Sequence, residues 1–91
     1  MTQTIIVADD HPLFRAALKQ AVSQAVPDAE TVEVDSIKAL QAAVESHPDA
    51  DLVLLDLNMP GAHGFSGLVF MRGQYPGLPV VVVSGSEELQ V

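Results

Sequence analysis

The sequence contains no cysteine, few cations and no apolar run long enough to cross a lipid bilayer. Without cysteine, the chain forms neither disulfides nor thiolate metal sites. Four lysine and arginine residues stand against twelve aspartates and glutamates, and the net charge of −8 repels phosphate backbones. The N-terminus has no basic segment followed by an apolar one, as a secretory leader would have. We therefore expect a soluble, cytoplasmic protein that binds no membrane and, by itself, no nucleic acid.

The chain alternates between two kinds of segment. Its 91 residues, of which 48% are apolar, suffice for one domain with a modest core. Runs rich in β-branched residues predict strands at Thr4–Asp9, Glu30–Asp35, Leu52–Leu57 and Leu78–Ser84. Apolar residues at helical spacing predict helices at 12–25, 37–46 and 64–74, and a further helix start at Ser86. This order, with its short loops, predicts parallel strands with helices on both faces.

Burial can be predicted for two of the strands. The runs at 52–57 and 78–84 are apolar at nearly every position, so we expect both strands to be buried on both faces. The first helix is indicated by six apolar residues that recur at helical spacing: Phe14, Ala17, Leu18, Ala21, Val22 and Ala25. Of these, Phe14 fits an exposed position as well as the core.

Polar side chains stand at the ends of three predicted strands. The stretch IIVADDHP at 5–12 ends in Asp9 and Asp10, Asp56 lies near the end of the third strand, and Ser84 ends the fourth. In parallel sheets, ligands bind at the carboxyl ends of the strands. Each residue alone is explained by a turn or a helix cap. Their joint occurrence at matched strand ends predicts a binding site.

The residue types suggest the chemistry of that site. Three clustered carboxylates suit a hard divalent cation such as Mg²⁺, which would cancel their mutual repulsion. Asp56 could form an aspartyl phosphate, and Ser84 could hydrogen-bond a phosphoryl oxygen. His11 and His63 flank the site, and we interpret them as loop residues at its rim. Neither their spacing nor a third nitrogen ligand supports a transition-metal site.

Three motifs, in order, are IIVADDHPLFRAAL, DLVLLDLNMPG and LPVVVVSG. Together they resemble the receiver domain of bacterial response regulators, most of all the subgroup with a LuxR-type helix-turn-helix output. The resemblance extends over the whole chain. It implies a flavodoxin-like, doubly wound parallel sheet in strand order 2-1-3-4. It also implies a phosphoprotein of phosphorelay signal transduction that is not an enzyme and regulates transcription through an output domain beyond these residues.

The resemblance also implies a role for each site residue. Asp56 would be the phosphoacceptor and, with Asp10, a direct ligand of Mg²⁺, whereas Asp9 would act through water. The backbone carbonyl of Asn58 would complete the protein ligands, and Ser84 would be the switch hydroxyl. A sensor histidine kinase, or a small donor such as acetyl phosphate, would supply the phosphoryl group.

The sequence departs from the family pattern after the fourth strand. The family has a fifth strand, which carries a lysine that pairs with the phosphoryl group, and a fifth helix. Residues 1–91 therefore resemble a receiver domain that is incomplete at its C-terminus. We expect the fourth strand to be an open apolar edge, through which the chain forms a homodimer or a domain-swapped oligomer.

Two other functions compete with phospho-acceptance. The chain could be a non-switching interaction or dimerisation fragment of a receiver, and the sequence does not separate this from the first hypothesis. It could also be a Mg²⁺-dependent aspartyl phosphatase. Phosphatases of the haloacid-dehalogenase type need a second aspartate two residues after the nucleophile, where this chain has Asn58. The phosphatase is therefore the weaker alternative.

Overall fold

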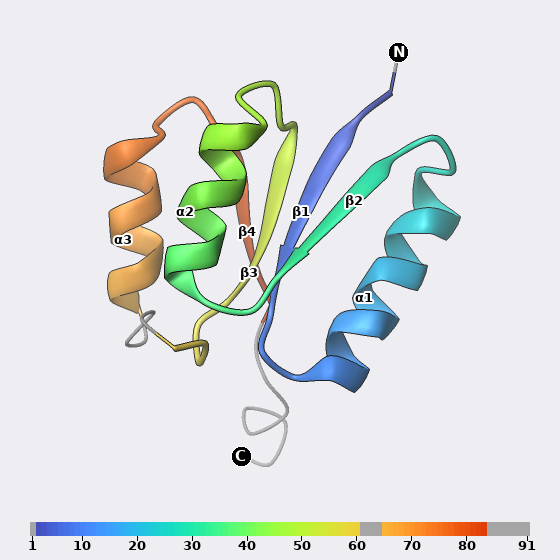
Figure 1. Cartoon of the computed structure of the whole chain (residues 1–91), viewed down its shortest axis with the longest axis horizontal. Helices are drawn as coiled ribbons and strands as arrows, with labels where there is room; N and C mark the ends of the chain where they lie inside the picture. The colour runs from blue at the N-terminus through green and yellow to red at the C-terminus, as the bar shows by residue number, and fades with distance from the viewer. Residues whose placement is uncertain (1, 61–64, 84–91) are drawn as a thin grey trace.

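The computed structural model describes residues 2–60 and 65–83, which form a four-stranded parallel sheet with helices on both faces (Figure 1). The elements are β1 (Thr4–Ala8), α1 (Pro12–Ala25), β2 (Glu30–Val34), α2 (Ile37–Ser46), β3 (Leu52–Asp56), α3 (Phe65–Gln74) and β4 (Val80–Val83). The strand order is β2-β1-β3-β4, which confirms the predicted flavodoxin-like arrangement. The helix predicted to start at Ser86 lies outside the described residues.

Local signals in the sequence fix where two of the helices begin. Pro12 opens α1, where its missing N–H costs no helical hydrogen bond. At the start of α2, the Ser36 hydroxyl accepts a hydrogen bond from the backbone N–H of Ala39 at 3.0 Å. None of the helices in the described ranges has the length and apolar character that crossing a membrane requires.

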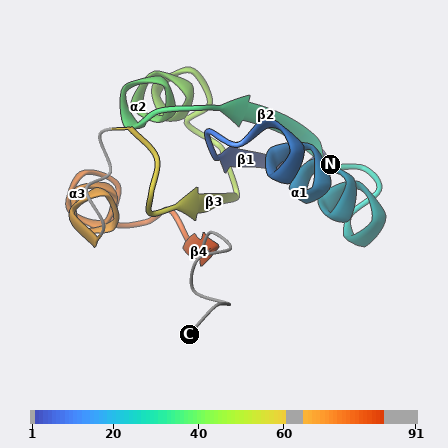
Figure 2. The same cartoon turned by 90° about the horizontal axis from the view of Figure 1, so that it is seen from below.

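The two faces of the sheet are covered unequally. Figure 2 shows α2 and α3 on one face and α1 on the other. The main core lies on the α2 and α3 side and is formed by Ile6, Ala8, Leu40, Ala43, Val44, Val53, Leu55, Met59 and Met71. Side chains alternate between the faces of a strand, so Ile5 and Val7 point toward α1, and both are buried.

The apolar positions of α1 are largely exposed. Val22 is the one buried residue of this helix, whereas Phe14 is 39% exposed. Leu18 is half-buried, and Ala17, Ala21 and Ala25 are exposed. A single helix has no described neighbour on this face, so only the residues directly above the sheet are covered.

The prediction that β4 is buried on both faces is also wrong. Val81 pairs in register with Leu54, which points to the α1 side of the sheet, and Val81 is 48% exposed. The reason is the position of α1, which packs mainly against β1 and β2 and does not reach β4. Within the described residues, β4 is the edge of the sheet, as the strand order implied by the resemblance predicts.

Candidate functional site

Two neighbouring strands bring the acidic residues together. β1 and β3 are paired, and Ala8 lies opposite Leu55, so the next residues, Asp9 and Asp56, meet at the carboxyl end of the sheet. The backbone N–H of Asp9 donates to the carbonyl of Val34 at 3.0 Å, which continues the hydrogen bonding of β1 beyond its last residue. Both carboxylates are fully buried. The parallel topology thus places two carboxylates side by side in the interior.

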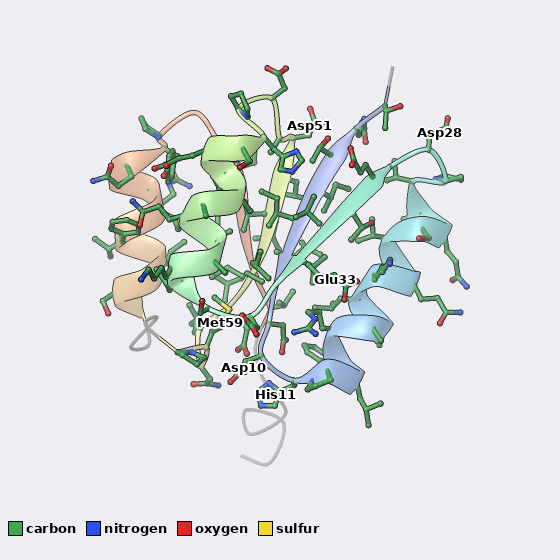
Figure 3. All side chains as sticks on the ribbon, viewed as in Figure 1. Asp10, His11, Asp28, Glu33, Asp51 and Met59 are labelled. Atoms are coloured by element: carbon green, nitrogen blue, oxygen red, sulfur yellow. The ribbon has the colours of Figure 1, made fainter. Side chains whose placement is uncertain are left out.

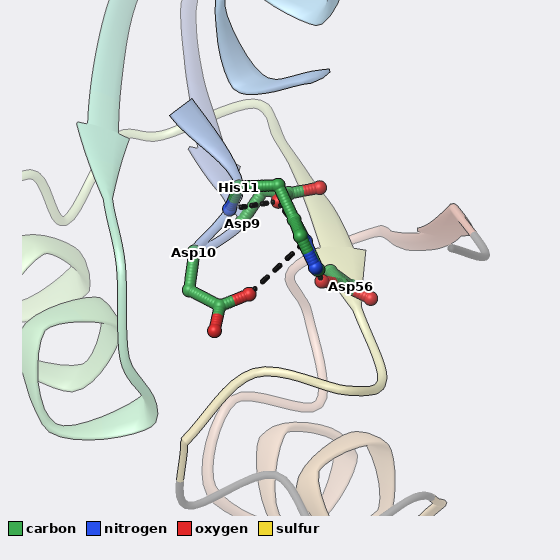
Figure 4. A group of neighbouring side chains, drawn as sticks. All are labelled: Asp9, Asp10, His11 and Asp56. Carbon is green, nitrogen blue, oxygen red and sulfur yellow. Dashed lines mark hydrogen bonds and ion pairs between the residues drawn. The ribbon is translucent and has the colours of Figure 1, made fainter. Parts of the chain in front are cut away.

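Asp10 and His11 complete the cluster (Figure 4), whose candidate ligand atoms all lie within 4.8 Å of one another. Asp9 Oδ1 accepts a hydrogen bond from the His11 backbone N–H at 2.7 Å, and Asp56 Oδ1 accepts one from the Asn58 backbone N–H at 3.1 Å. In the described part of the chain, three buried oxygens accept none: Asp9 Oδ2, Asp10 Oδ1 and Asp56 Oδ2. Such oxygens usually have a partner in folded proteins.

Burying these carboxylates side by side makes the ionised form of Asp56 unfavourable. Burial raises the pKa of Asp56, and the negative charges of Asp9 and Asp10 raise it further, while the Asn58 N–H acts in the opposite direction. A divalent cation at the cluster would remove this penalty and give the three orphan oxygens a partner. Carboxylate oxygens are the ligands that Mg²⁺ prefers, so the residues fit this ion.

The sequence interpretation understated His11. The residue does lie at the rim, with its side chain 57% exposed, but Nδ1 is 3.1 Å from Asp9 Oδ1 and from Asp10 Oδ1. The same nitrogen lies 3.5 Å from Asp56 Oδ2. The hydrogen bond to Asp9, followed by the charge of Asp10, raises the pKa of His11. The available signal was the turn formed by Asp9, which directs the next residues back over its own carboxylate.

Arg15 is a second residue that sequence reasoning missed. Its Nη1 donates to the backbone carbonyl of Asp9 at 2.9 Å, and its Nε donates to Glu33 Oε1 at 3.1 Å. Lys19 Nζ also lies 3.4 Å from Glu33. These contacts tie the connection between β1 and α1 to the neighbouring strand β2. Arg15 therefore holds the backbone that carries the first two aspartates.

The structure describes most of the predicted site residues. It brings Asp9, Asp10 and Asp56 together and places the backbone of Asn58 beside them through its N–H. Ser84 and His63 lie outside the described residues, so their positions stay predictions. The roles of all these residues in phosphoryl transfer also stay predictions at this point.

Comparison with known proteins points to one family. A family model described as the response regulator receiver domain matches residues 5–91. The glycerol metabolism activator of Pseudomonas putida is 44% identical over 87 residues, covering 96% of this chain and 39% of that protein. The nitrate/nitrite response regulator protein NarL of Escherichia coli K12 is 40% identical, covering 91% of this chain and 38% of NarL. The chain thus spans about two fifths of the length of these curated relatives.

Solved structures agree on the fold. RcsB of Salmonella enterica serovar Typhimurium, bound to promoter P1flhDC in the presence of phosphomimetic BeF₃⁻, superposes with a TM-score of 0.75 at 26% identity. The superposition covers 90% of this chain and 41% of that one. A sulfate-bound point mutant of the response regulator MaeR gives a TM-score of 0.82 over 100% of this chain and 80% of that one. At 14% identity, this second likeness supports the fold alone.

Proposed function

Because the chain belongs to the response-regulator receiver family, we propose that Asp56 accepts a phosphoryl group in a two-component phosphorelay. The observation that carries this proposal is the convergence of three carboxylates whose buried oxygens accept no hydrogen bond in the described part of the chain. A carboxylate cluster with a purely structural role would be expected to satisfy its oxygens. Free oxygens at the carboxyl end of a parallel sheet are available to a ligand.

The hydrogen bonding of Asp56 leaves it able to react. Oδ1 accepts from the Asn58 N–H and Oδ2 accepts no hydrogen bond from the described residues, so the carboxylate has lone pairs for the ion and for phosphorus. In the proposed step, an Asp56 oxygen–phosphorus bond forms as the bond from phosphorus to the donor breaks. The donor is the phosphohistidine of a sensor kinase, or acetyl phosphate, and it keeps the electron pair of the broken bond. Both donors are cytoplasmic, so we place the reaction in the cytoplasm.

Asp10, Asp56 and the backbone carbonyl of Asn58 would hold Mg²⁺ directly, and Asp9 would act through a bound water. The ion would neutralise charge on the transferring phosphoryl group, which is the main requirement of such reactions. The fully buried Asp9 would keep that water in place, and the Arg15 contact to its backbone would position Asp9 itself. Ser84 would then be drawn to the phosphoryl oxygens and act as the switch hydroxyl.

A labelling experiment tests the proposal. We expect the intact mass to increase by one phosphoryl group after incubation with acetyl phosphate and Mg²⁺, and hydroxylamine to remove that group. Asp56→Asn should abolish the increase. Asp51→Asn, which changes an exposed aspartate at the opposite end of the sheet, should leave it intact. If wild-type protein that is shown to be folded gains no mass after this incubation, phospho-acceptance is contradicted.

We further propose that the chain self-associates through β4 as a homodimer or a swapped oligomer. The exposed Val81 on this edge strand supports the proposal, because open apolar edges pair with other chains. Val81→Lys should shift the protein toward monomer in sedimentation, whereas Val69→Lys on the exposed face of α3 should not. A monodisperse wild-type monomer at micromolar concentration would refute this. Whole relatives add an output domain, through which we propose that the phosphorylated protein regulates transcription.

A further inference from the structure

His11 holds one ring nitrogen at nearly equal distances from three carboxylates. Figure 4 shows the ring lying over the cluster, with Nδ1 3.1 Å from Asp9 Oδ1, 3.1 Å from Asp10 Oδ1 and 3.5 Å from Asp56 Oδ2. The three oxygens come from three different residues. The imidazole therefore belongs to the cluster geometrically, although its outer side is open to solvent.

The hydrogen bond of the His11 ring does not satisfy the oxygens around it. A protonated Nδ1 carries one N–H and serves one acceptor well, and here that acceptor is Asp9 Oδ1. Asp10 Oδ1 and Asp56 Oδ2 are close to the ring, but neither accepts a hydrogen bond within the described residues. A single N–H thus leaves two buried oxygens unsatisfied. A metal ion would instead accept a lone pair from the nitrogen, from Asp10 and from Asp56 at once, with Asp9 reached through a bound water.

The spacing of the donor atoms fits a metal centre. Adjacent ligands of an octahedral ion lie about 3.0 Å apart when each metal–ligand bond is about 2.1 Å. Nδ1 lies 3.1 Å from Asp10 Oδ1 and 3.5 Å from Asp56 Oδ2, the two carboxylates proposed as direct ligands, and both separations are close to this value. Asp9 and Asp56 are fully buried, so two of the three carboxylates are fixed in place by the fold.

We propose that His11 Nδ1 is a direct ligand at this site, and that the site consequently binds divalent first-row transition metals such as Mn²⁺ more tightly than Mg²⁺. The proposal rests on the cation site of the proposed function and adds a nitrogen donor to it. Imidazole favours transition metals, whereas carboxylates alone suit Mg²⁺, Ca²⁺ and Mn²⁺. The sequence interpretation rejected a transition-metal site because neither the spacing of His11 and His63 nor a third nitrogen ligand supported one. Two direct carboxylates, the Asn58 carbonyl and one imidazole suffice for a mixed oxygen and nitrogen site.

The decisive measurement is electron spin-echo modulation of Mn²⁺ bound to the untagged full chain. We expect the ¹⁴N modulation of a directly coordinated imidazole in the wild type. The modulation should vanish in His11→Ala and in His11→Asn, and persist in His47→Ala. His47 lies at the other end of the sheet, where it caps α2, and so provides a matched control.

Calorimetry supplies the second readout. We expect His11→Ala to weaken Mn²⁺ binding by about tenfold or more and to change Mg²⁺ binding by less than about threefold. Bound Mn²⁺ without nitrogen modulation, or with unchanged affinity in the variant, would overturn the role of His11. That result would leave the proposed phosphorylation of Asp56 standing, because labelling with acetyl phosphate tests it separately. Failure of both Mg²⁺ and Mn²⁺ to bind the folded wild type would overturn the cation site and the inference together.

Discussion

The acidic side chains at the two ends of the sheet lie in different surroundings (Figure 3). At the amino end, Asp51 Oδ2 accepts a hydrogen bond from the Thr4 backbone N–H at 2.9 Å, and Glu45 accepts one from the Tyr75 hydroxyl at 3.3 Å. Asp51 and Glu45 are exposed. At the carboxyl end, Asp9 and Asp56 are fully buried, and each has an oxygen that accepts no hydrogen bond in the described ranges.

The carboxylates at the amino end stabilise the fold, whereas the buried carboxylates at the other end destabilise it. An exposed carboxylate with a donor is solvated on its other side and contributes modestly to stability. A buried carboxylate beside two others has an energetic cost that the fold bears in the absence of a ligand. Such a cost is typical of binding sites, where the ligand supplies the missing interactions. Neutralising a carboxylate should therefore raise stability at the carboxyl end and leave it nearly unchanged at the amino end.

The largest contrast is expected from neutralising one aspartate at each end. In EDTA at neutral pH, Asp56→Asn should raise the free energy of unfolding by about 1–3 kcal/mol, because it removes a buried charge next to Asp9 and Asp10. Asp51→Asn should change it by less than about 0.5 kcal/mol, since the amide oxygen still accepts from Thr4. Urea denaturation measures both values. Similar effects at the two ends would show that the buried carboxylates do not destabilise the fold.

Divalent cations should stabilise the protein through the carboxyl end alone. At free Mg²⁺ of about ten times its Kd, the gain is about 1.4 kcal/mol by mass action. Thermal unfolding with and without Mg²⁺ should show this shift in wild type and in Asp51→Asn. A much smaller shift is expected in Asp56→Asn. An equal shift in all three proteins would place the ion elsewhere.

The pH dependence sharpens the same contrast. The pKa of Asp56 is raised above its ordinary 3.8 and that of His11 above 6.5. A group with a raised pKa contributes stability that is present below its unfolded pKa and lost as pH rises through its folded pKa. Metal-free protein should therefore lose stability in two steps as pH rises, the upper one above pH 6.5. The urea midpoint in EDTA measures this, and His11→Ala should remove the upper step, whereas His47→Ala should keep it.

The smallest effect is expected at the amino end. Tyr75 lies beside a pocket of 440 Å³ between the C-terminal ends of α2 and α3. Its hydroxyl donates to an exposed glutamate, so Tyr75→Phe should cost less than about 0.5 kcal/mol. The melting temperature with and without Mg²⁺ tests this, and the Mg²⁺ shift should equal that of wild type. A reduced shift would show that the two ends are coupled.

Sequence reasoning located the carboxylates because their positions follow from topology. Asp9 and Asp56 directly follow or end runs of β-branched and aliphatic residues, and parallel strands bring such ends together. It did not locate the His11 ring, because adjacency along the chain does not say which way a side chain points. That direction is set by the turn in which the His11 N–H bonds to Asp9.

Burial was predicted less well than position. A run of four valines fits a strand covered on both faces, but the pattern contains no information about whether a helix lies above each face. Val81 is exposed because α1 packs over β1 and β2 instead. Phe14 is exposed for a related reason, since the spacing defines a face of α1 but not what that face meets.

The acidic cluster lies at the ends of the two inner strands, which should open less readily than the outer ones. β1 is hydrogen-bonded on both sides, to β2 and β3, and β3 is likewise bonded to β1 and β4. Amide hydrogens of β1 and β3 should therefore exchange with deuterated solvent most slowly, and those of β4 sooner. Asp9 and Asp56 follow or end the two slow strands. β4 can thus open and pair with another chain while Asp9 and Asp56 keep their arrangement.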